Sequence, residues 1–409
     1  MMSEQAALNI LQETSNQLGW TRVAFGDVVR KVSNKVDPWE SGLERYVAGE
    51  HLDTDDLRIR RWGVIGDDYL GPAFHMRFKS GQVLYGSRRT YLRKVALADF
   101  EGITANTTYV LETKDPSLLL PELLPFIMQT EAFHDHSIAN SKGSVNPYVN
   151  FSDIASFVFL LPPIQEQSRL VEVLSGNQQL LEKLEGMLSS LLDLEHAMLK
   201  KNFGGKYGVN PHGYPASKLS EIALINSGLA KGKKASEATV EMLYLRVANV
   251  KDGELDLKDV KKIVVDREKI SRYALQYGDV LMTEGGDLDK LGRGTVWQNE
   301  VNGCLHQNHV FAVRVDPEKL DPWYLAALAR SPYGRSYFRQ SAKRSSNLAS
   351  INKGQVSQMI VPHPALDEQR EWLKGYSHIR RQQDETRQRI QACKAFGAQV
   401  LRKGLNRDI

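Results

Sequence analysis

The chain has 409 residues, of which 42% are hydrophobic and 25% are charged, a composition typical of a globular protein with two or three domains. The net charge of +4 is too mildly basic to mark a nucleic-acid binder by itself. There is no apolar run of membrane-spanning length, no signal-peptide layout, and no disulfide framework, since only Cys304 and Cys393 are present. These features predict a cytoplasmic protein that has no contact with a membrane.

The chain opens with a segment, residues 1–19, that is predicted to be an N-terminal helix, and its first 17 residues have no counterpart further on. Residues 20–162 are predicted to form an α/β globule with mixed strands. In this region short β-type runs such as TTYVL and SFVFLL alternate with helical stretches such as PELLPFIMQTEAFHD, and Gly, Asp and Asn clusters separate them.

Residues 163–203 are predicted to form a long helix that begins at the motif LPPIQEQ. Apolar residues recur along it in steps of four and three, as in a coiled coil, and a second helix could bury the resulting narrow seam. Polar Asn177 and Glu195 occupy two of the seam positions. The alternative is an ordinary core helix. The apolar seam residues are Leu170, Leu174, Leu181, Leu184, Leu188 and Leu191.

A Gly- and Pro-rich linker, residues 204–213, lets the chain turn back before a second predicted globule, residues 214–361. Residues 362–405 then form a second predicted long helix, which begins at the motif HPALDEQ. Its seam is less apolar, because Gln383 and Thr386 lie near the middle. The apolar members of this seam are Trp372, Tyr376, Ile379 and Ile390.

The two halves of the chain resemble each other. Glu166 and Gln167 match Glu368 and Gln369, 202 positions later, and GQVL from Gly81 matches GDVL further on. Small changes in offset along the alignment are what loop insertions produce. The sequence therefore predicts a duplicated unit of about 200 residues and a pseudo-twofold molecule, in which the two long helices pack against each other.

Catalytic patterns are incomplete. SVNPYVN, which contains Asn146, is one proline short of the element that holds the target nitrogen in amino-methyltransferases, and no Gly-rich cofactor loop precedes it. Asp99, Glu112 and Lys114 have only a loose nuclease-like spacing. CLHQNH brings Cys304 close to two histidines, but strand alternation would put Cys304 and His306 on one face and His309 on the other. We expect no catalytic residues and no metal site, with a divergent DNA nuclease or methyltransferase as the alternative.

Two globules, each ending in LPPIQEQ or HPALDEQ and a long helix, together with GDVLMTEGGDLDKLGRG and CLHQNHVFAV, resemble the specificity subunit of type I restriction-modification enzymes. The resemblance implies a non-catalytic subunit in which each globule is a target recognition domain that reads half of a bipartite, asymmetric site on double-stranded DNA. The long helices would then be an antiparallel spacer.

The same resemblance implies partners: two methyltransferase subunits, which methylate adenine after flipping it out of the stack, and motor-nuclease subunits. Adenosylmethionine, ATP and Mg would belong to these partners, with no cofactor on this chain. Two alternatives remain, the recognition subunit of a fused methyltransferase-nuclease and a plain coiled-coil scaffold.

Bidentate Arg, Asn or Gln contacts to base edges discriminate between sequences, whereas phosphate contacts do not. Polar and aromatic clusters in loops are therefore the candidate DNA-binding residues. In the first globule they are Arg88, Arg89, Tyr91, Arg93, Lys94, Asn106 and Lys142. In the second globule they are Lys290, Arg293, Gln307, Asn308, Lys343 and Arg344. Arg58, Arg60 and Arg61, and the lysines of KGKK at 231–234, are expected to contact only phosphates, if they contact DNA at all.

Overall fold

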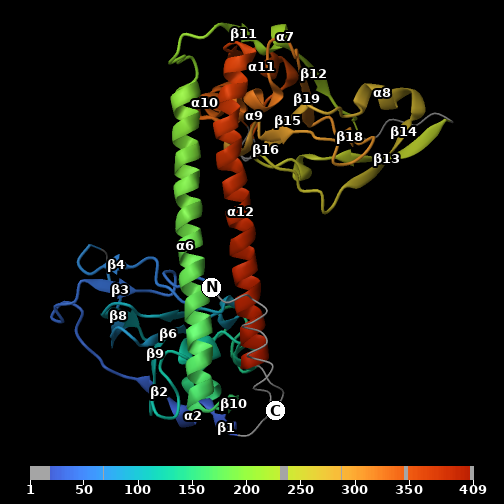
Figure 1. Ribbon diagram of the computed structural model, residues 1–409. Coiled ribbons are helices and arrows are strands. Elements are labelled where there is room, and N and C mark those ends of the chain that lie inside the picture. The colour runs from blue at the N-terminus through green and yellow to red at the C-terminus, as the bar shows by residue number, and fades with distance from the viewer. Residues whose placement is uncertain (1–18, 68, 231–237, 287, 345–348, 406–409) are drawn as a thin grey trace. The chain divides into compact units, whose positions relative to one another are not determined.

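The computed structural model describes residues 19–67, 69–230, 238–286, 288–344 and 349–405. The chain divides into two compact units, Met1–Glu185 with Gln388–Ile409, and Gly186–Arg387. Each unit holds one globule and a part of both long helices (Figure 1). The helix predicted for residues 1–19 falls on residues of which only Gly19 is described.

The globule of the first unit contains two four-stranded sheets, in the orders β2-β9-β6-β7 and β4-β3-β8-β5. Strand β6 is buried along its whole length, as its apolar run requires. The strands of the first sheet are β2 (Val29–Val32), β9 (Thr108–Thr113), β6 (Val83–Gly86) and β7 (Val95–Leu97). Those of the second sheet are β4 (Gly63–Val64), β3 (Arg45–Val47), β8 (Gly102–Ala105) and β5 (Phe74–Phe78).

A strand pair and several short helices complete this globule. Strand β1 (Thr21–Ala24) pairs antiparallel with β10 (Val158–Leu161), directly before the long helix. Helix α4 begins at an N-cap, where Thr130 Oγ1 accepts a hydrogen bond from the amide of Phe133. The helices are α2 (Phe25–Val28), η1 (Thr90–Leu92), α3 (Leu124–Ile127), α4 (Glu131–Ala139) and α5 (Phe151–Ala155).

The second unit repeats this plan. Its sheet orders are β12-β19-β15-β17 and β14-β13-β18, with β16-β21-β20 as a small third sheet and β11 paired with β22. The strands are β11 (Ala216–Lys218), β12 (Ala223–Ser227), β13 (Thr239–Leu245), β14 (Lys261–Asp266), β15 (Val280–Thr283), β16 (Gly285–Gly286), β17 (Gly294–Val296), β18 (Leu305–His306), β19 (Val310–Val315), β20 (Lys343–Arg344), β21 (Ala349–Ser350) and β22 (Ile360–Pro362). Its short helices are α7 (Leu219–Ile222), η2 (Val247–Asn249), η3 (Arg267–Lys269), α8 (Ile270–Tyr273), η4 (Leu288–Lys290), α9 (Pro322–Arg330), α10 (Pro332–Ser341) and α11 (Lys353–Ser357).

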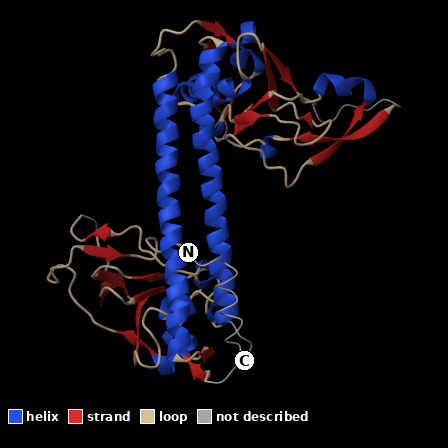
Figure 2. Ribbon diagram, in the orientation of Figure 1, coloured by secondary structure: helices blue, strands red, loops and turns tan. Residues whose placement is uncertain are grey.

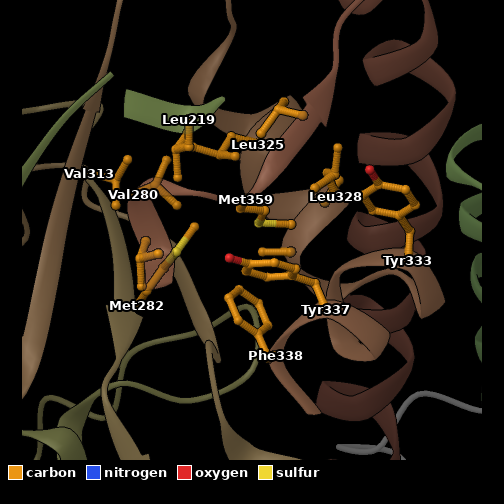
Figure 3. Close-up of a cluster of buried hydrophobic side chains, with 14 of the residues drawn as sticks. Leu219, Val280, Met282, Val313, Leu325, Leu328, Tyr333, Tyr337, Phe338 and Met359 are labelled. Carbon is orange, nitrogen blue, oxygen red and sulfur yellow. The ribbon is translucent and has the colours of Figure 1, made fainter. Parts of the chain in front are cut away.

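The core of the second unit joins strand β15 to helices α9 and α10 (Figure 3). Val280 and Met282 from the strand lie in one cluster with Leu325, Tyr337 and Phe338 from the helices. All five side chains are buried, so the β12-β19-β15-β17 sheet is covered by the two helices on this face.

The duplication is visible in the strand pairings. In the first unit β3 pairs in parallel with β8, joining Tyr46 to Ile103, and in the second unit β13 pairs in parallel with β18, joining Tyr244 to Leu305. The remaining ladders of these sheets are antiparallel. Figure 2 shows the strands of both globules in red. The predicted pair of α/β globules with two long packed helices is therefore confirmed.

The long helices are α6 (Ile164–Phe203) and α12 (Leu366–Gly404). In the first unit they are antiparallel neighbours: the Leu170 side chain lies against Gly404, and Asn177 Nδ2 donates to the carbonyl of Cys393 over 3.1 Å. In the second unit Gln383 Nε2 donates to the carbonyl of Leu191 over 3.1 Å. None of the described helices is long and apolar enough to cross a membrane.

The seam positions are buried to different extents. Leu170, Leu174, Leu181, Leu184, Tyr376 and Ile379 are less than one-tenth exposed, whereas Leu188, Leu191, Trp372 and Ile390 are partly exposed. Gln383, at 0%, is as buried as any apolar seam residue. The Gln383 side-chain amide donates a hydrogen bond to the backbone of the facing helix, at Leu191. A polar side chain can therefore be buried in the seam with its hydrogen-bonding groups satisfied.

Glu195 is a buried carboxylate, 4% exposed, in the second unit. Tyr376 Oη donates to it over 3.0 Å and Gln383 Nε2 over 2.9 Å, and the Arg330 guanidinium lies 3.3 Å away. Burial raises the pKa of Glu195, but Arg330, Gln383 and Arg380 together lower it below its usual value. The ionised carboxylate therefore ties α6, α12 and α9 together.

The repeated Glu-Gln pair has a structural reason. Gln167 Nε2 donates to the carbonyls of Leu118 and Pro162, and its Oε1 accepts from the amide of Leu120. Gln369 repeats these three bonds with Lys319, Pro364 and Asp321, at 2.8–2.9 Å. Both glutamines are buried. Each one joins the first turn of a long helix to a loop of the globule that precedes this helix in the chain: Gln167 to residues 118–120 and Gln369 to residues 319–321.

Replacing Gln369 by alanine removes all three bonds and leaves two carbonyls and one amide unpaired in a dry site. We expect Gln369→Ala to lower the free energy of unfolding by about 2–3 kcal/mol. The same substitution at Gln388, an exposed glutamine of the same helix, is the matched control and should change it by less than about 0.5 kcal/mol. Denaturant unfolding of both variants measures the difference, and equal effects would contradict the role given to Gln369.

His134 of α4 is 2% exposed, and neither of its ring nitrogens has a hydrogen-bond partner among the described residues. Burial, together with the nearby charge of Arg93, lowers the pKa of His134 to about 4. The folded chain thus keeps this imidazole neutral at a pH where the unfolded chain would protonate it.

Stability should therefore fall in acid. The contribution of neutral His134 is complete above the unfolded pKa of 6.5 and is lost as the pH falls towards the folded pKa of about 4. The loss is about 3 kcal/mol, since one pKa unit corresponds to about 1.4 kcal/mol. His134→Leu removes the titrating group at similar volume. Denaturant unfolding at about pH 7 and about pH 4.5 should show a smaller loss for the variant; equal losses would rule out His134 as the cause.

Candidate nucleic-acid interface

Three loops of the first unit meet where strand β6 ends. The amide of Ser87 donates to the carbonyl of Thr107, in the turn between β8 and β9, over 3.0 Å. The carbonyl of Ser87 accepts from the amide of Val149 over 2.9 Å. Loop 142–149 and the β8-β9 turn are thus held on either side of the chain that leaves β6.

Predicted residues come together on these loops. Arg88 forms a backbone bridge with Tyr148, and its guanidinium lies 5.8 Å from the centroid of that ring. Lys142 pairs with Tyr148 through two backbone bonds of 2.7 and 2.9 Å. Arg89 Nε donates to Asn146 Oδ1 over 3.3 Å. All five residues are exposed, so cations and an aromatic ring share one surface, as phosphate binding and base stacking require.

The backbone bonds that join Ser87 to Thr107 and to Val149 are called the frame here, and the second unit has the same frame. The amide of Glu284 donates to the carbonyl of His309 over 2.9 Å, and its carbonyl accepts from the amide of Ile351 over 2.8 Å. Strands β16 and β20 both pair with β21, which brings Lys343 next to the Gly-rich loop. These bonds correspond one to one with those of Ser87, Thr107 and Val149.

Residues predicted separately in the two halves therefore occupy equivalent positions. The frame matches Asn106 with Asn308 and Lys142 with Lys343. It also matches Lys94 with Arg293, because the Lys94 carbonyl accepts from Gly86 over 3.0 Å and the Arg293 carbonyl from Thr283 over 2.9 Å. Sequence reasoning missed Tyr148 and considered His309 only as a metal ligand.

Several predicted residues have structural partners. Lys142 Nζ lies 3.0 Å from an Asp153 carboxylate oxygen. Arg93 lies 2.8 Å from Asp55 and 2.7 Å from Glu131. Burial alone would lower the pKa of Arg93, but these carboxylates raise it overall. Lys94 Nζ donates to the carbonyl of Gly49, and burial lowers its pKa. The Arg93 and Lys94 side chains support the loop, and a role of either in DNA binding stays a prediction.

The other predicted residues lie on the same loops. Tyr91 is 52% exposed and Asn106 is exposed, while Gln307 and Lys290 are partly exposed. The Lys290 carbonyl accepts from Thr283 Oγ1 over 3.1 Å, which holds that loop against β15. The Arg344 side chain and residues 231–237 lie outside the described part.

The arginines of the RIRRW segment form ion pairs within the first unit. Arg58 and Arg60 each lie 2.7 Å from Glu185 of α6, and both also pair with Asp56. Arg61 pairs with Asp53 at 2.5 Å. These side chains bind the loop to the helix, so the charge of Arg58 and Arg60 is offset by acidic neighbours.

Glu112 and Lys114, which were considered for catalysis, form hydrogen bonds within the first unit. Glu112 Oε1 accepts from Arg30, and its Oε2 accepts from Gln82 over 2.7 Å. Lys114 Nζ donates to the carbonyl of Gly26 over 2.5 Å. Within the described residues there is no group of three or more His, Cys, Asp or Glu side chains that could hold a metal ion.

The CLHQNH segment is a strand followed by a turn. Cys304 and His306 are buried, and His306 Nδ1 lies 2.7 Å from the carbonyl of Val310. Burial raises the pKa of the Cys304 thiol to about 12, so it stays protonated. His309 is exposed on the turn, away from both.

Comparison with known proteins finds a family model, the type I restriction modification DNA specificity domain, that matches residues 18–186. A relative from Methanocaldococcus jannaschii, a type I restriction enzyme MjaX specificity subunit whose assignment is itself given as putative, is 25% identical over 41% of this chain and 39% of its own length. The aligned stretch is thus less than half of that relative.

Two solved structures share the fold. The S subunit of a type I restriction-modification system from M. genitalium has 13% identity and a TM-score of 0.62 over 97% of this chain and 98% of its own. A chain from a study of type I R-M complex assembly and conformational transition has 19% identity and a TM-score of 0.55, over 95% and 97%.

Proposed function

Because the chain belongs to the family of type I restriction-modification specificity subunits, we propose that it reads a bipartite DNA site, one half with each globule. The observation that carries this proposal is one backbone frame presenting different side chains. Arg88 and Arg89 in the first unit are replaced by Gly285 and Gly286 in the second. Equal frames with unequal side chains are what an asymmetric site demands.

The side chains divide into two roles. Lys142, whose ammonium group also pairs with Asp153, and Lys343 are point charges at the rim of each frame and suit phosphates, which give affinity but no sequence information. Asn106 and Asn308 each sit on the turn beside the frame and suit adenine, whose N6 and N7 an amide can contact together. Arg88 suits the O6 and N7 of guanine. The six other predicted cations are assigned to phosphates or to loop support.

The chain itself contributes no chemical step to the complex. Methylation of adenine and DNA cleavage belong to methyltransferase and motor-nuclease partners, which would hold adenosylmethionine, ATP and Mg. Exposed apolar side chains on α6 support docking of a partner helix. They are Leu180 in the first unit, and Met187, Leu192 and Leu194 in the second, each at least 41% exposed. A fused methyltransferase-nuclease could use the same surface.

The helices would set the number of unread base pairs. Helix α6 has 40 residues and α12 has 39. At 1.5 Å per residue such a helix measures about 60 Å. This exceeds one turn of DNA, about 34–36 Å, so a gap between the two half-sites follows from helix length.

The test is a matched pair of alanine variants in the complex of this chain with its methyltransferase subunits. Asn106→Ala should reduce discrimination at one position of one half-site by about 1–3 kcal/mol, and Asn308→Ala should do so only in the other half-site. Lys142→Ala, the control, should weaken binding to all sequences alike. Methylation of a random-sequence library measures all three. A complex that selects no bipartite site would refute the function.

A further inference from the structure

Glu284, His309 and Asn308 form a chain of contacts at the reading loops of the second unit. The Glu284 carboxylate contacts His309 Nδ1, and Asn308 Nδ2 lies 3.3 Å from His309 Nε2. Glu284 and His309 are also linked through their backbones over 2.9 Å. The side chain of Glu284 is 26% exposed and that of His309 is 53% exposed, so the imidazole separates the carboxylate from the surface.

The chemistry of the three groups fixes their hydrogens. An ionised carboxylate only accepts hydrogen bonds, so Nδ1 of His309 must carry the proton. In the neutral ring Nε2 is then an acceptor, and the Asn308 amide must turn its NH₂ group towards it. The amide oxygen consequently points the other way. One N–H and the oxygen remain available, since no further hydrogen bond of the Asn308 side chain occurs among the described residues.

An adenine presents N7 as an acceptor and N6 as a donor in the major groove. Asn308 contacts both only if its remaining N–H meets N7 and its oxygen meets N6. We propose that Glu284 and His309 are positioning residues that hold the Asn308 amide in the orientation for reading adenine. This inference rests on the proposed function and adds to it the two residues that orient the amide for one base of the second half-site.

The described residues of the first unit contain no such chain of carboxylate, imidazole and amide beside the frame. At the positions of Glu284 and His309 it has Ser87 and Thr107, and Ser87 Oγ donates to the Thr107 carbonyl over 2.7 Å. Asn106 therefore has no imidazole beside it. Thr107→Ala is accordingly a matched control for changes at His309.

The experiment uses the complex of the full chain with its methyltransferase and DNA duplexes that carry the site mapped by methylation. Each adenine of the second half-site is replaced in turn by 7-deazaadenine, which lacks the N7 acceptor. At one position this replacement should weaken DNA binding by the wild-type complex about tenfold. This loss of affinity, the 7-deazaadenine penalty, should vanish in Asn308→Ala. His309→Ala and Glu284→Gln should reduce the penalty to about threefold or less.

His309→Gln should restore it, because the glutamine amide can donate to Glu284 and accept from Asn308. Thr107→Ala should leave the penalty unchanged, and unaltered discrimination in the first half-site shows that each variant is folded. A penalty that Asn308→Ala abolishes but His309→Ala and Glu284→Gln leave intact would overturn the inference and spare the function. A wild-type complex without a bipartite site would overturn both.

Discussion

A buried glutamine in the first turn of each long helix is the constraint on which the rest of the structure depends. Gln167 and Gln369 each satisfy one carbonyl and one amide of the loop they face and one carbonyl directly before their own helix, so the first turn of each helix is held against its globule. Without the glutamine those backbone groups would be buried unpaired. The repetition of Glu-Gln after a proline thus reflects a joint that is used twice.

The two units differ where each globule meets the helices. In the second unit Glu195 binds Arg330 and Tyr376 and closes the junction. In the first unit the internal repeat places Gly397 at the position of Glu195 and Gln129 at the position of Arg330, and both residues line a cavity of ≈ 1020 Å³. There the globule is joined to α6 instead by Arg58 and Arg60 through Glu185, a partly exposed contact that salt screens more readily. The same fold is therefore held by two unlike polar clusters.

The sequence predicted what depends on local patterns. Heptad spacing predicted two long packed helices, and the repeat predicted two α/β globules; both are present. It did not predict that Arg93 would pair with Asp55 and Glu131, because those partners are distant in the chain and meet only through tertiary structure. For the same reason loop composition identified Lys142 and Lys343 without revealing that they are equivalent. Glu195 was recognised as a polar seam residue, but its partner Arg330 could not be.

We propose that each globule reads DNA independently of the other, on a backbone frame that both share. The most direct test replaces residues 20–160 by the first globule of another family member and maps the methylated adenines in DNA modified by the chimeric complex. If each globule reads one half-site, one half of the site should have a new sequence, and the other half and the number of base pairs between them should be unchanged. A change in both halves would contradict it.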